Sequence, residues 1–175
     1  TYKIQIFIPE LRFKDVLVGL LQALRNRHIW INGMIGFLMY LPVTIFAELW
    51  GITYLVQVHH FSNIVATQVV SSIFLGWAIG ATFSGWLSDL IGRRKLPLIF
   101  GSIFAFILAC LILYWPGLSV NELYVLFFLF GVMTSAQVVV FAIGREVSPK
   151  YIAATAVSVT NMFTMIGGAI FQPVV

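Results

Sequence analysis

The chain has 175 residues, of which 61% are hydrophobic and only 9% are charged. Soluble domains carry about a quarter charged residues, so this composition excludes an ordinary water-soluble protein and predicts a chain surrounded by a lipid bilayer. The net charge of +4 does not indicate nucleic-acid binding, because a membrane explains how the cations are distributed. The single cysteine, Cys110, excludes an intrachain disulfide framework.

Residues 1–28 are the only stretch with the polarity of a water-exposed segment. Apolar residues recur at helical spacing from Phe13 to Arg25, which predicts an amphipathic helix on the membrane surface within a cytoplasmic linker. A soluble helix packed on another domain is the alternative. The chain lacks an initial methionine and ends without a polar tail, so we expect a fragment of a longer protein.

Residues 29–175 are predicted to form a transmembrane bundle of five helices, which makes the fold all-α and integral to the membrane. Each apolar segment has the length of about 20 residues that a helix needs to cross the hydrocarbon core. The first segment is longer than necessary, and a tilt or a kink at Pro42 would accommodate it. The predicted segments are 29–58, 63–87, 96–114, 123–143 and 152–172.

The cations all fall on one side of the alternation between segments and loops. The loops 59–62 and 115–122 contain no Lys or Arg. Cytoplasmic loops of membrane proteins are enriched in these residues, so the cationic side, with the N-terminal segment, is predicted to face the cytoplasm. The cations in this pattern are Lys3, Arg12, Lys14, Arg25, Arg27, Arg93, Arg94, Lys95, Arg145 and Lys150.

Residues 85–95, Gly-Trp-Leu-Ser-Asp-Leu-Ile-Gly-Arg-Arg-Lys, join the second and third segments. Gly92 allows the backbone to reverse, and the three cations that follow it suit the membrane–water interface. Asp89 is placed either to cap the next helix or to pair with one of these cations. A generic cationic turn is the alternative explanation of this stretch.

This stretch resembles the signature loop of the major facilitator superfamily, G-x-x-x-D-x-x-G-R-[RK], which joins the second and third helices of a half-transporter. The matching residues are Gly85, Asp89, Gly92, Arg93 and Arg94. Leu90 stands where the strongest form has a basic residue, a departure that is commoner in the second half of such transporters. The resemblance implies a facilitator-type bundle and helices seven to eleven of twelve, without the other half; a first-half assignment stays open.

The resemblance also implies roles for the segments. In this family the first helix of each three-helix repeat lines the solute cavity, the second faces the other half and the third is peripheral. Segments 29–58 and 123–143 would therefore line the cavity, and the apolar segment 96–114 would be peripheral. Asp89, Arg93 and Arg94 would form a conformational lock, and the Arg145–Glu146 pair resembles the family's charged cytoplasmic lock.

Polar side chains within the segments are the candidates for contact with solute, because such groups are costly in lipid unless they face a partner or a watery cavity. Glu48 could exchange a proton during transport or form a structural pair near the outer surface. Gln137 and Asn161 can donate and accept hydrogen bonds, either to solute or between helices. Tyr40 and Trp77 could stack on a solute or pack against other helices.

Small residues and histidines form two further patterns. Gly76, Gly80 and Ser84 recur every four residues, which allows another helix to approach closely and predicts a packing seam. His59 and His60 lie in the loop 59–62, and without a third ligand we interpret them as part of a solvated loop rather than a metal site.

The sequence contains no arrangement suited to enzyme chemistry, and we expect neither a cofactor nor a metal. The resemblance to the major facilitator superfamily implies secondary active transport of a small polar solute by alternating access, and we expect a bacterial inner membrane. Proton symport through Glu48 is left open. The alternatives are a uniporter of the same fold and a non-transporting membrane scaffold that receives partner helices on its small-residue seam.

Overall fold

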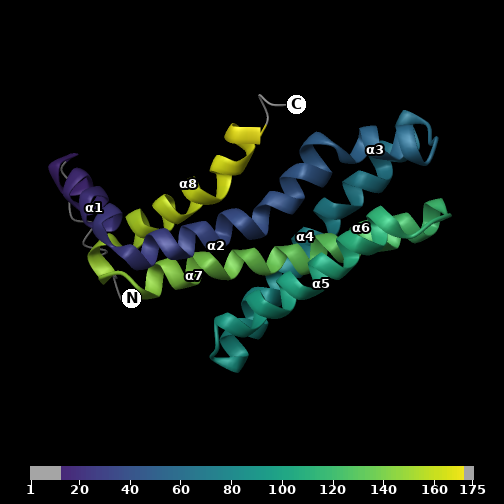
Figure 1. Ribbon diagram of the computed structural model, residues 1–175. Helices are drawn as coiled ribbons and strands as arrows, with labels where there is room; N and C mark the ends of the chain where they lie inside the picture. Colours follow the sequence, from purple (N-terminus) through teal and green to yellow (C-terminus); the bar gives the residue numbers. More distant parts are fainter. Residues whose placement is uncertain (1–12, 172–175) are drawn as a thin grey trace, which may run out of the picture.

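The computed structural model describes residues 13–171, and within that range every regular element is a helix (Figure 1). Residues 1–12 of the predicted linker, with Lys3 and Arg12, lie outside the described residues, as does Gln172 at the predicted end of the fifth segment. The elements are α1 (Phe13–Arg25), α2 (Arg27–Val43), η1 (Thr44–Leu49), α3 (Gly51–Val58), α4 (Asn63–Ile91), α5 (Lys95–Tyr114), α6 (Val120–Thr134), η2 (Ser135–Val138), α7 (Val139–Glu146), η3 (Lys150–Ile152) and α8 (Ala153–Phe171).

Five of the helical stretches are long and apolar enough to cross a membrane, which confirms the predicted all-α membrane bundle. The bounds of α1 are those that the apolar spacing predicts. The candidate spans among the described residues are Arg27–Leu49, Asn63–Ile91, Lys95–Tyr114, Val120–Glu146 and Lys150–Phe171.

The first span is not one continuous α-helix. Pro42 lies inside α2, and the next residues form the π-helix η1. In that segment Trp50 donates its backbone N–H to the carbonyl of Ile45, five residues earlier, at 2.8 Å. Proline has no N–H and clashes with the turn before it, but α2 continues through Pro42, and the π-helix begins two residues after it.

The fourth span is also interrupted. The 3-10 helix η2 separates α6 from α7 and contains Gln137. At the start of this span, the side chains of Ser119 and Glu122 reciprocally cap the first turn of α6, a capping box that fixes where the helix begins. The second span, α4, is by contrast a continuous α-helix that extends four residues beyond its predicted end at residue 87.

Two helix pairs form the framework of the bundle: α4 packs along α6, and α8 packs along α2. The α4–α6 contact is close enough that a Cβ atom at Gly76 would overlap the backbone carbonyl of Phe128, and one at Gly131 would overlap that of Ile73. The prediction that small residues of the second segment admit another helix is confirmed, because Gly76, Gly80 and Ser84 are all buried.

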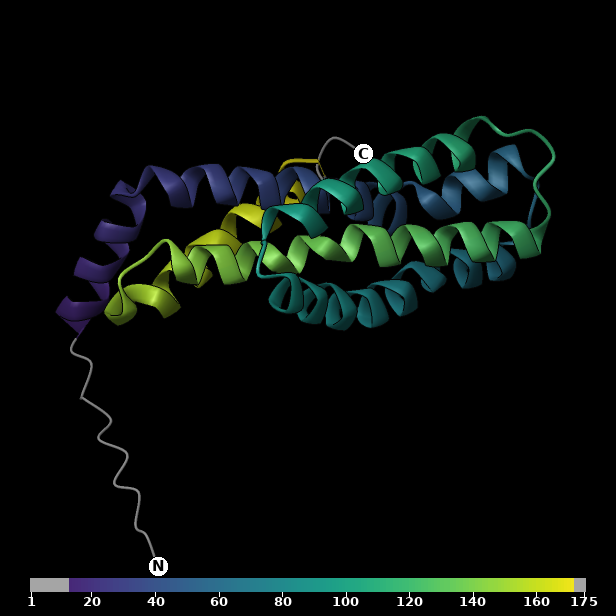
Figure 2. The ribbon, with the colours of Figure 1, turned by 90° about the horizontal axis from the view of Figure 1, so that it is seen from below.

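The turns gather at the two ends of the bundle as their charges predict. In Figure 1 and Figure 2 the turns 59–62 and 115–119 lie together at one end. The α1–α2 junction and the α7–η3 turn lie at the other, which we call the cationic end. Arg94 of the α4–α5 turn is linked to the cationic end through its ion pair with Glu146, the last residue of α7.

The third span, α5, exposes an almost purely apolar surface. Its contacts are made mainly with α6. The hydroxyl of Ser102 is satisfied within the helix, because it donates to the carbonyl of Leu98 at 2.8 Å. The exposed large side chains of this helix are Ile99, Phe100, Ile103, Phe104, Phe106, Ile107, Leu113 and Tyr114.

Candidate functional site

The π-helix η1 brings Glu48 together with Tyr40. The phenol of Tyr40 donates a hydrogen bond to Oε1 of Glu48 at 3.2 Å, although the two residues are eight positions apart. Tyr40 is half-buried and Glu48 is exposed on the surface of the described bundle. The Glu48 carboxylate therefore accepts a hydrogen bond from a neutral donor on Oε1, and the side chain is otherwise exposed.

Gln137 lies in a buried polar seam between α2, η2–α7 and α8. Its exposed fraction is 1%, and its Nε2 donates to Oγ1 of Thr164 at 3.4 Å. Thr164 in turn donates to the backbone carbonyl of Thr160 at 3.1 Å. This arrangement gives Gln137 an interhelical contact, which is one of the two roles that its sequence position allows.

Asn32 extends the same seam and was not singled out by the sequence reasoning above. Its Nδ2 donates to the carbonyl of Val140 at 2.7 Å, and its Oδ1 is buried without a partner among the described residues. The hydroxyl of Thr160 is likewise buried and unpartnered. The signal was available, because Asn32 is an amide in an apolar segment, as are Gln137 and Asn161.

The two remaining aromatic and amide candidates lie in different surroundings. Asn161 is exposed on α8, next to Thr160, which faces the seam. Trp77 packs against the main hydrophobic cluster of the bundle, and its indole N–H is buried without an acceptor in the described part of the chain. The structure therefore brings Tyr40 to Glu48 and Gln137 to Thr164, but gives Asn161 no such partner.

Arg94 is the centre of the charge cluster at the cationic end. Its Nη1 pairs with Oδ1 of Asp89, and its Nη2 and Nε bond to Oε1 of Glu146 at 2.7 and 3.0 Å. A further bond runs from Nη1 to the hydroxyl of Ser88 at 3.1 Å. These carboxylates raise the pKa of the Arg94 guanidinium, so this side chain stays charged at any physiological pH.

The backbone around Arg94 makes this cluster possible. Gly92 takes a left-handed conformation with φ of 65°, which reverses the chain directly after α4. Asp89 lies in the last turn of α4 rather than in the turn itself, and it pairs with a cation instead of capping α5. Arg94 thus joins the end of α4 to the end of α7, two spans that are distant in sequence.

The remaining members of the predicted lock lie on the surface. Arg93 and Arg145 are exposed, and the partner that the structure gives Glu146 is Arg94 rather than its neighbour Arg145. Gly85 lies within α4, and a Cβ atom added there would meet nothing within 4 Å. The predicted lock therefore depends structurally on Asp89, Gly92, Arg94 and Glu146.

The two histidines at the opposite end are not equivalent. His59 packs between Tyr54 and Phe61, with both ring centroids 5.5 Å from its own, while His60 takes a left-handed conformation. Burial of the imidazole, together with the neighbouring His60, lowers the pKa of His59. No group of three or more metal-ligating side chains is found among the residues described.

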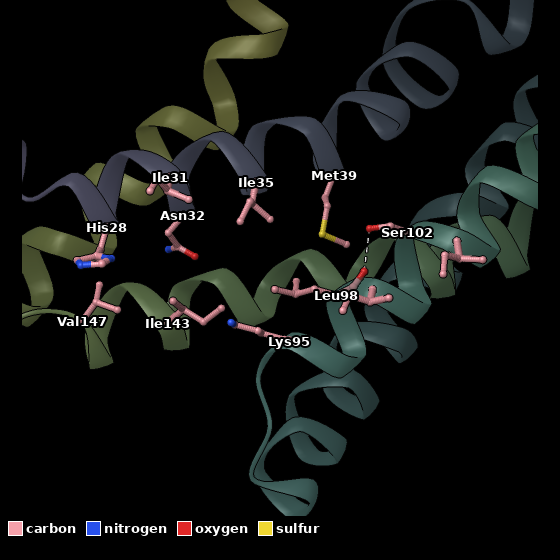
Figure 3. Close-up of a pocket in the computed structure, with 12 residues that line it drawn as sticks. His28, Ile31, Asn32, Ile35, Met39, Lys95, Leu98, Ser102, Ile143 and Val147 are labelled. Carbon is pink, nitrogen blue, oxygen red and sulfur yellow. Dashed lines mark hydrogen bonds between the residues drawn. The ribbon is translucent and has the colours of Figure 1, made fainter.

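A cavity lies between α2, α5 and α7, and Asn32 of the polar seam forms part of its wall. It has a volume of about 670 Å³, and the close-up in Figure 3 shows Ile31, Ile35 and Met39 of α2 facing Leu98 and Ile143 across it. His28, Asn32, Lys95 and Ser102 are its polar lining residues. Since most of its wall is apolar, this cavity suits an apolar group better than a polar solute.

Comparison with known proteins gives matches along nearly the whole chain. Residues 6–172 match the family model of the Major Facilitator Superfamily. The chain is 28% identical over 170 residues to a probable hexose phosphate transport protein of Chlamydia muridarum, which covers 91% of this chain and 35% of that protein.

Two further relatives are similarly distant. The chain is 29% identical over 151 residues to a phosphoglycerate transporter protein of Salmonella typhimurium, covering 84% of this chain and 32% of that protein. It is 27% identical over 189 residues to a glycerol-3-phosphate transporter of Haemophilus influenzae, covering 97% and 38%. The chain therefore spans about a third of the length of these relatives. No solved structure matches it.

Proposed function

The chain belongs to the major facilitator superfamily, and from that premise we propose that it is part of a secondary active transporter that moves a small polar solute by alternating access. One observation carries the proposal. The helical breaks η1 and η2 fall within the first and fourth spans, the two that open the inverted repeats, and these breaks contain Glu48 and Gln137. Interrupted helices in corresponding positions of two repeats are the common location of a transporter's binding site.

In this proposal the solute contacts polar groups of the interrupted spans. Glu48, oriented by Tyr40, offers a hydrogen-bond acceptor on the open surface of the bundle. Gln137 acts from within the buried seam, so its effect on solute is exerted through the packing of α2 against α8. Asn161 is exposed on α8 and is available to solute or to a further helix.

The Asp89–Arg94–Glu146 cluster serves as the conformational lock. It ties α4 to α7 at the cationic end, which we place in the cytoplasm because Lys and Arg collect there. A closed cytoplasmic end corresponds to the outward-facing state, so the cluster would favour that state. In such a cycle the cluster need only bias a two-state equilibrium by a few kcal/mol.

Proton coupling through Glu48 is a second element of the proposal, since a carboxylate open to a watery cavity can take up and release a proton during the cycle. A uniporter of the same fold would use Glu48 only for binding. The membrane scaffold is less well supported, because the small-residue seam on which it relies is occupied by α6 of the same chain.

The wider setting is also part of the proposal. We assign the chain to the second half of the transporter, with its N-terminal segment in the cytoplasm and the remaining helices supplied by the rest of a longer protein. The relatives named above are bacterial, which favours a bacterial inner membrane. The α1 helix, which exposes Val16, Leu17 and Leu21, would lie at the inner membrane surface.

Uptake by the full-length transporter in proteoliposomes, with and without a pH gradient, tests this function. Asp89→Asn and Arg94→Gln are expected to lower the uptake rate at least tenfold, because either change breaks the lock. Lys150→Gln removes a cation from the same end without touching the cluster, and its uptake should stay within twofold of the original. Full uptake by both lock variants would contradict the role of the cluster.

The pH gradient separates the mechanisms of coupling. Uptake that requires an inward proton gradient, and loses that requirement in Glu48→Gln, supports symport through this carboxylate. Uptake that is indifferent to the gradient in both proteins supports a uniporter. If a well-folded protein takes up no solute, the scaffold alternative gains and the transport proposal fails.

A further inference from the structure

We propose that this part of the transporter selects a solute that carries an ammonium group and rejects phosphate esters. The inference rests on the proposed function, and it adds which chemical class of solute Glu48 would bind. Its grounds are the Glu48 carboxylate in the first span and the hydrogen bond that this carboxylate accepts from Tyr40. A further ground is the position of each Lys and Arg in the sequence.

The cations are confined to the borders of the spans. Between residues 28 and 92, between 96 and 144, and after residue 150, the sequence contains no Lys or Arg. The ion pairs in the described part of the chain both use Arg94, at the cationic end. The Lys and Arg residues of this chain therefore lie at the ends of its candidate spans, as Lys95 does, and not in their middle sections.

The carboxylates differ in how they are held. Asp89 and Glu146 are paired with Arg94, and Glu122 bonds the backbone and hydroxyl of Ser119 at the first turn of α6. Glu48 differs, because its only hydrogen bond among the described residues comes from the neutral phenol of Tyr40. Among these four carboxylates, Glu48 is therefore the one that lacks both a cation and a helix-capping role.

The geometry leaves Glu48 able to meet a solute. Tyr40 holds Oε1 from two turns away, so Oε2 is the oxygen free to accept, and the side chain is exposed rather than packed. In a cavity with less water than bulk solvent, a carboxylate attracts an ammonium group and repels a phosphate dianion, and both effects are stronger than at an aqueous surface. The pair therefore discriminates by charge.

This inference separates the chain from the relatives reported above. Their names specify hexose phosphate, phosphoglycerate and glycerol 3-phosphate, all of which are anions. Identities of 27–29% leave ample room for a change of substrate. A cation from the rest of the protein could attract a phosphate, but that phosphate would still face Glu48 from this side.

Uptake of four labelled probes by the full-length transporter in proteoliposomes tests the inference: ethanolamine, alanine, glucose and glycerol 3-phosphate. We expect uptake of at least one ammonium-bearing probe, ethanolamine or alanine, and at least tenfold slower uptake of glycerol 3-phosphate. Glu48→Gln should lower ammonium uptake at least tenfold. Glu48→Asp, which keeps the charge, should retain the preference for ammonium probes.

The control variant is Glu122→Gln, since glutamine also completes a capping box and Glu122 lies at the opposite end of α6 from η2. It should leave the ratio of the four uptake rates unchanged. Size-exclusion chromatography of each variant confirms that a loss of uptake is not a loss of fold.

The outcomes separate the two proposals. Uptake of glycerol 3-phosphate or glucose in preference to both ammonium probes would overturn the selectivity and leave transport intact. Ammonium uptake that is unaffected in Glu48→Gln would overturn the role of Glu48 in selection. Uptake of none of the four probes by folded protein would overturn the transport function, and the selectivity with it.

Discussion

The helix pairs α4–α6 and α2–α8 make the two most extensive contacts between long helices of the described bundle, yet they are built in different ways. In α4–α6 the backbones touch through glycine, with no room for a Cβ atom at Gly76 or Gly131. In α2–α8 the glycines face side chains instead, as Gly36 does with the hydroxyl of Thr164.

The two pairs also differ in their polar side chains. The described contacts of α4–α6 include a side-chain bond from Ser72 to the carbonyl of Tyr124 at 3.3 Å and, at the exposed edge, one from the phenol of Tyr124 to Oε1 of Gln68 at 3.1 Å. The α2–α8 side contains Asn32, Gln137, Thr160 and Thr164, with two polar atoms left unpartnered. A backbone-to-backbone contact resists displacement, whereas a polar seam with unused donors and acceptors has alternative arrangements. The comparison predicts a rigid pair and an adaptable pair.

The largest effect is expected in the rigid pair. In Gly131→Ala the new methyl group would overlap the carbonyl of Ile73, and neither backbone can move away without separating the helices. Overpacking of this kind costs about 3 kcal/mol, at the upper end of its usual range. Thermal unfolding of the full-length protein in detergent measures the loss as a lower Tm.

The matched control for that change is Gly85→Ala in the same pair of helices. Nothing lies within 4 Å of the added methyl group, and alanine favours an α-helix by about 1 kcal/mol over glycine. This variant should keep or raise the Tm. Equal losses in Gly131→Ala and Gly85→Ala would show that the close backbone contact does not decide the stability of α4–α6.

A smaller effect is expected from Gly144→Ala in α7, which packs against Thr160 and Asn32 of the adaptable pair. The added Cβ atom would lie 2.8 Å from Oγ1 of Thr160 and 3.4 Å from Nδ2 of Asn32, both of which are side-chain atoms. Because a side chain can turn away, we expect a loss of about 1–2 kcal/mol. Thermal unfolding should also show that Thr160→Ala in the same protein recovers most of it, since contacting residues are not additive.

Absence of rescue in that double variant would argue that the strain falls on the backbone, as in α4–α6. The two pairs would then be equally rigid, and the distinction between them would lose its physical basis.

Sequence patterns predict the α4–α6 contact better than the α2–α8 contact. The spacing of Gly76, Gly80 and Ser84 predicts a close helix contact, because one face of a single helix is enough to define it. The bounds of α1 and the reversal at Gly92 follow from equally local patterns. Each of these features is determined within about thirty residues, so periodicity and backbone preference are sufficient to find it.

The polar seam and the charge cluster could not be found in this way. Glu146 meets Arg94 across 52 residues, Gln137 meets Thr164 across 27, and Asn32 meets Val140 across 108. The sequence selects these residues by polarity, but which partner each one meets depends on how the spans pack. Likewise, Pro42 indicates a kink in the first span, but no local pattern predicts the π form of the segment that contains Glu48, in which Phe46 packs edge-on against Phe130 of α6.

A third test addresses a hydrogen bond of the polar seam, the one that Asn32 donates to Val140. Asn32→Leu removes the hydrogen bond from Nδ2 to the carbonyl of Val140, which is 2.7 Å long. Since interhelical hydrogen bonds in membrane proteins contribute about 0.6 to 2 kcal/mol, we expect a loss of about 1 kcal/mol. The measurement is again the Tm, with Cys110→Ser on the half-exposed side of α5 as a control that should change it little.

The smallest change in Tm should be an increase, and it is expected from removing the unpartnered hydroxyl of Thr160 in the seam. Thr160→Val keeps the shape of the side chain but removes a buried hydroxyl that has no partner among the described residues. Thr164 bonds the backbone carbonyl of Thr160, so that contact is retained. Because an unpaired buried polar group carries a desolvation cost, the variant should gain up to about 1 kcal/mol and a slightly higher Tm. If Thr160→Val instead unfolds earlier, the hydroxyl has a partner that stabilises the fold, and the α2–α8 pair is as fully satisfied as α4–α6.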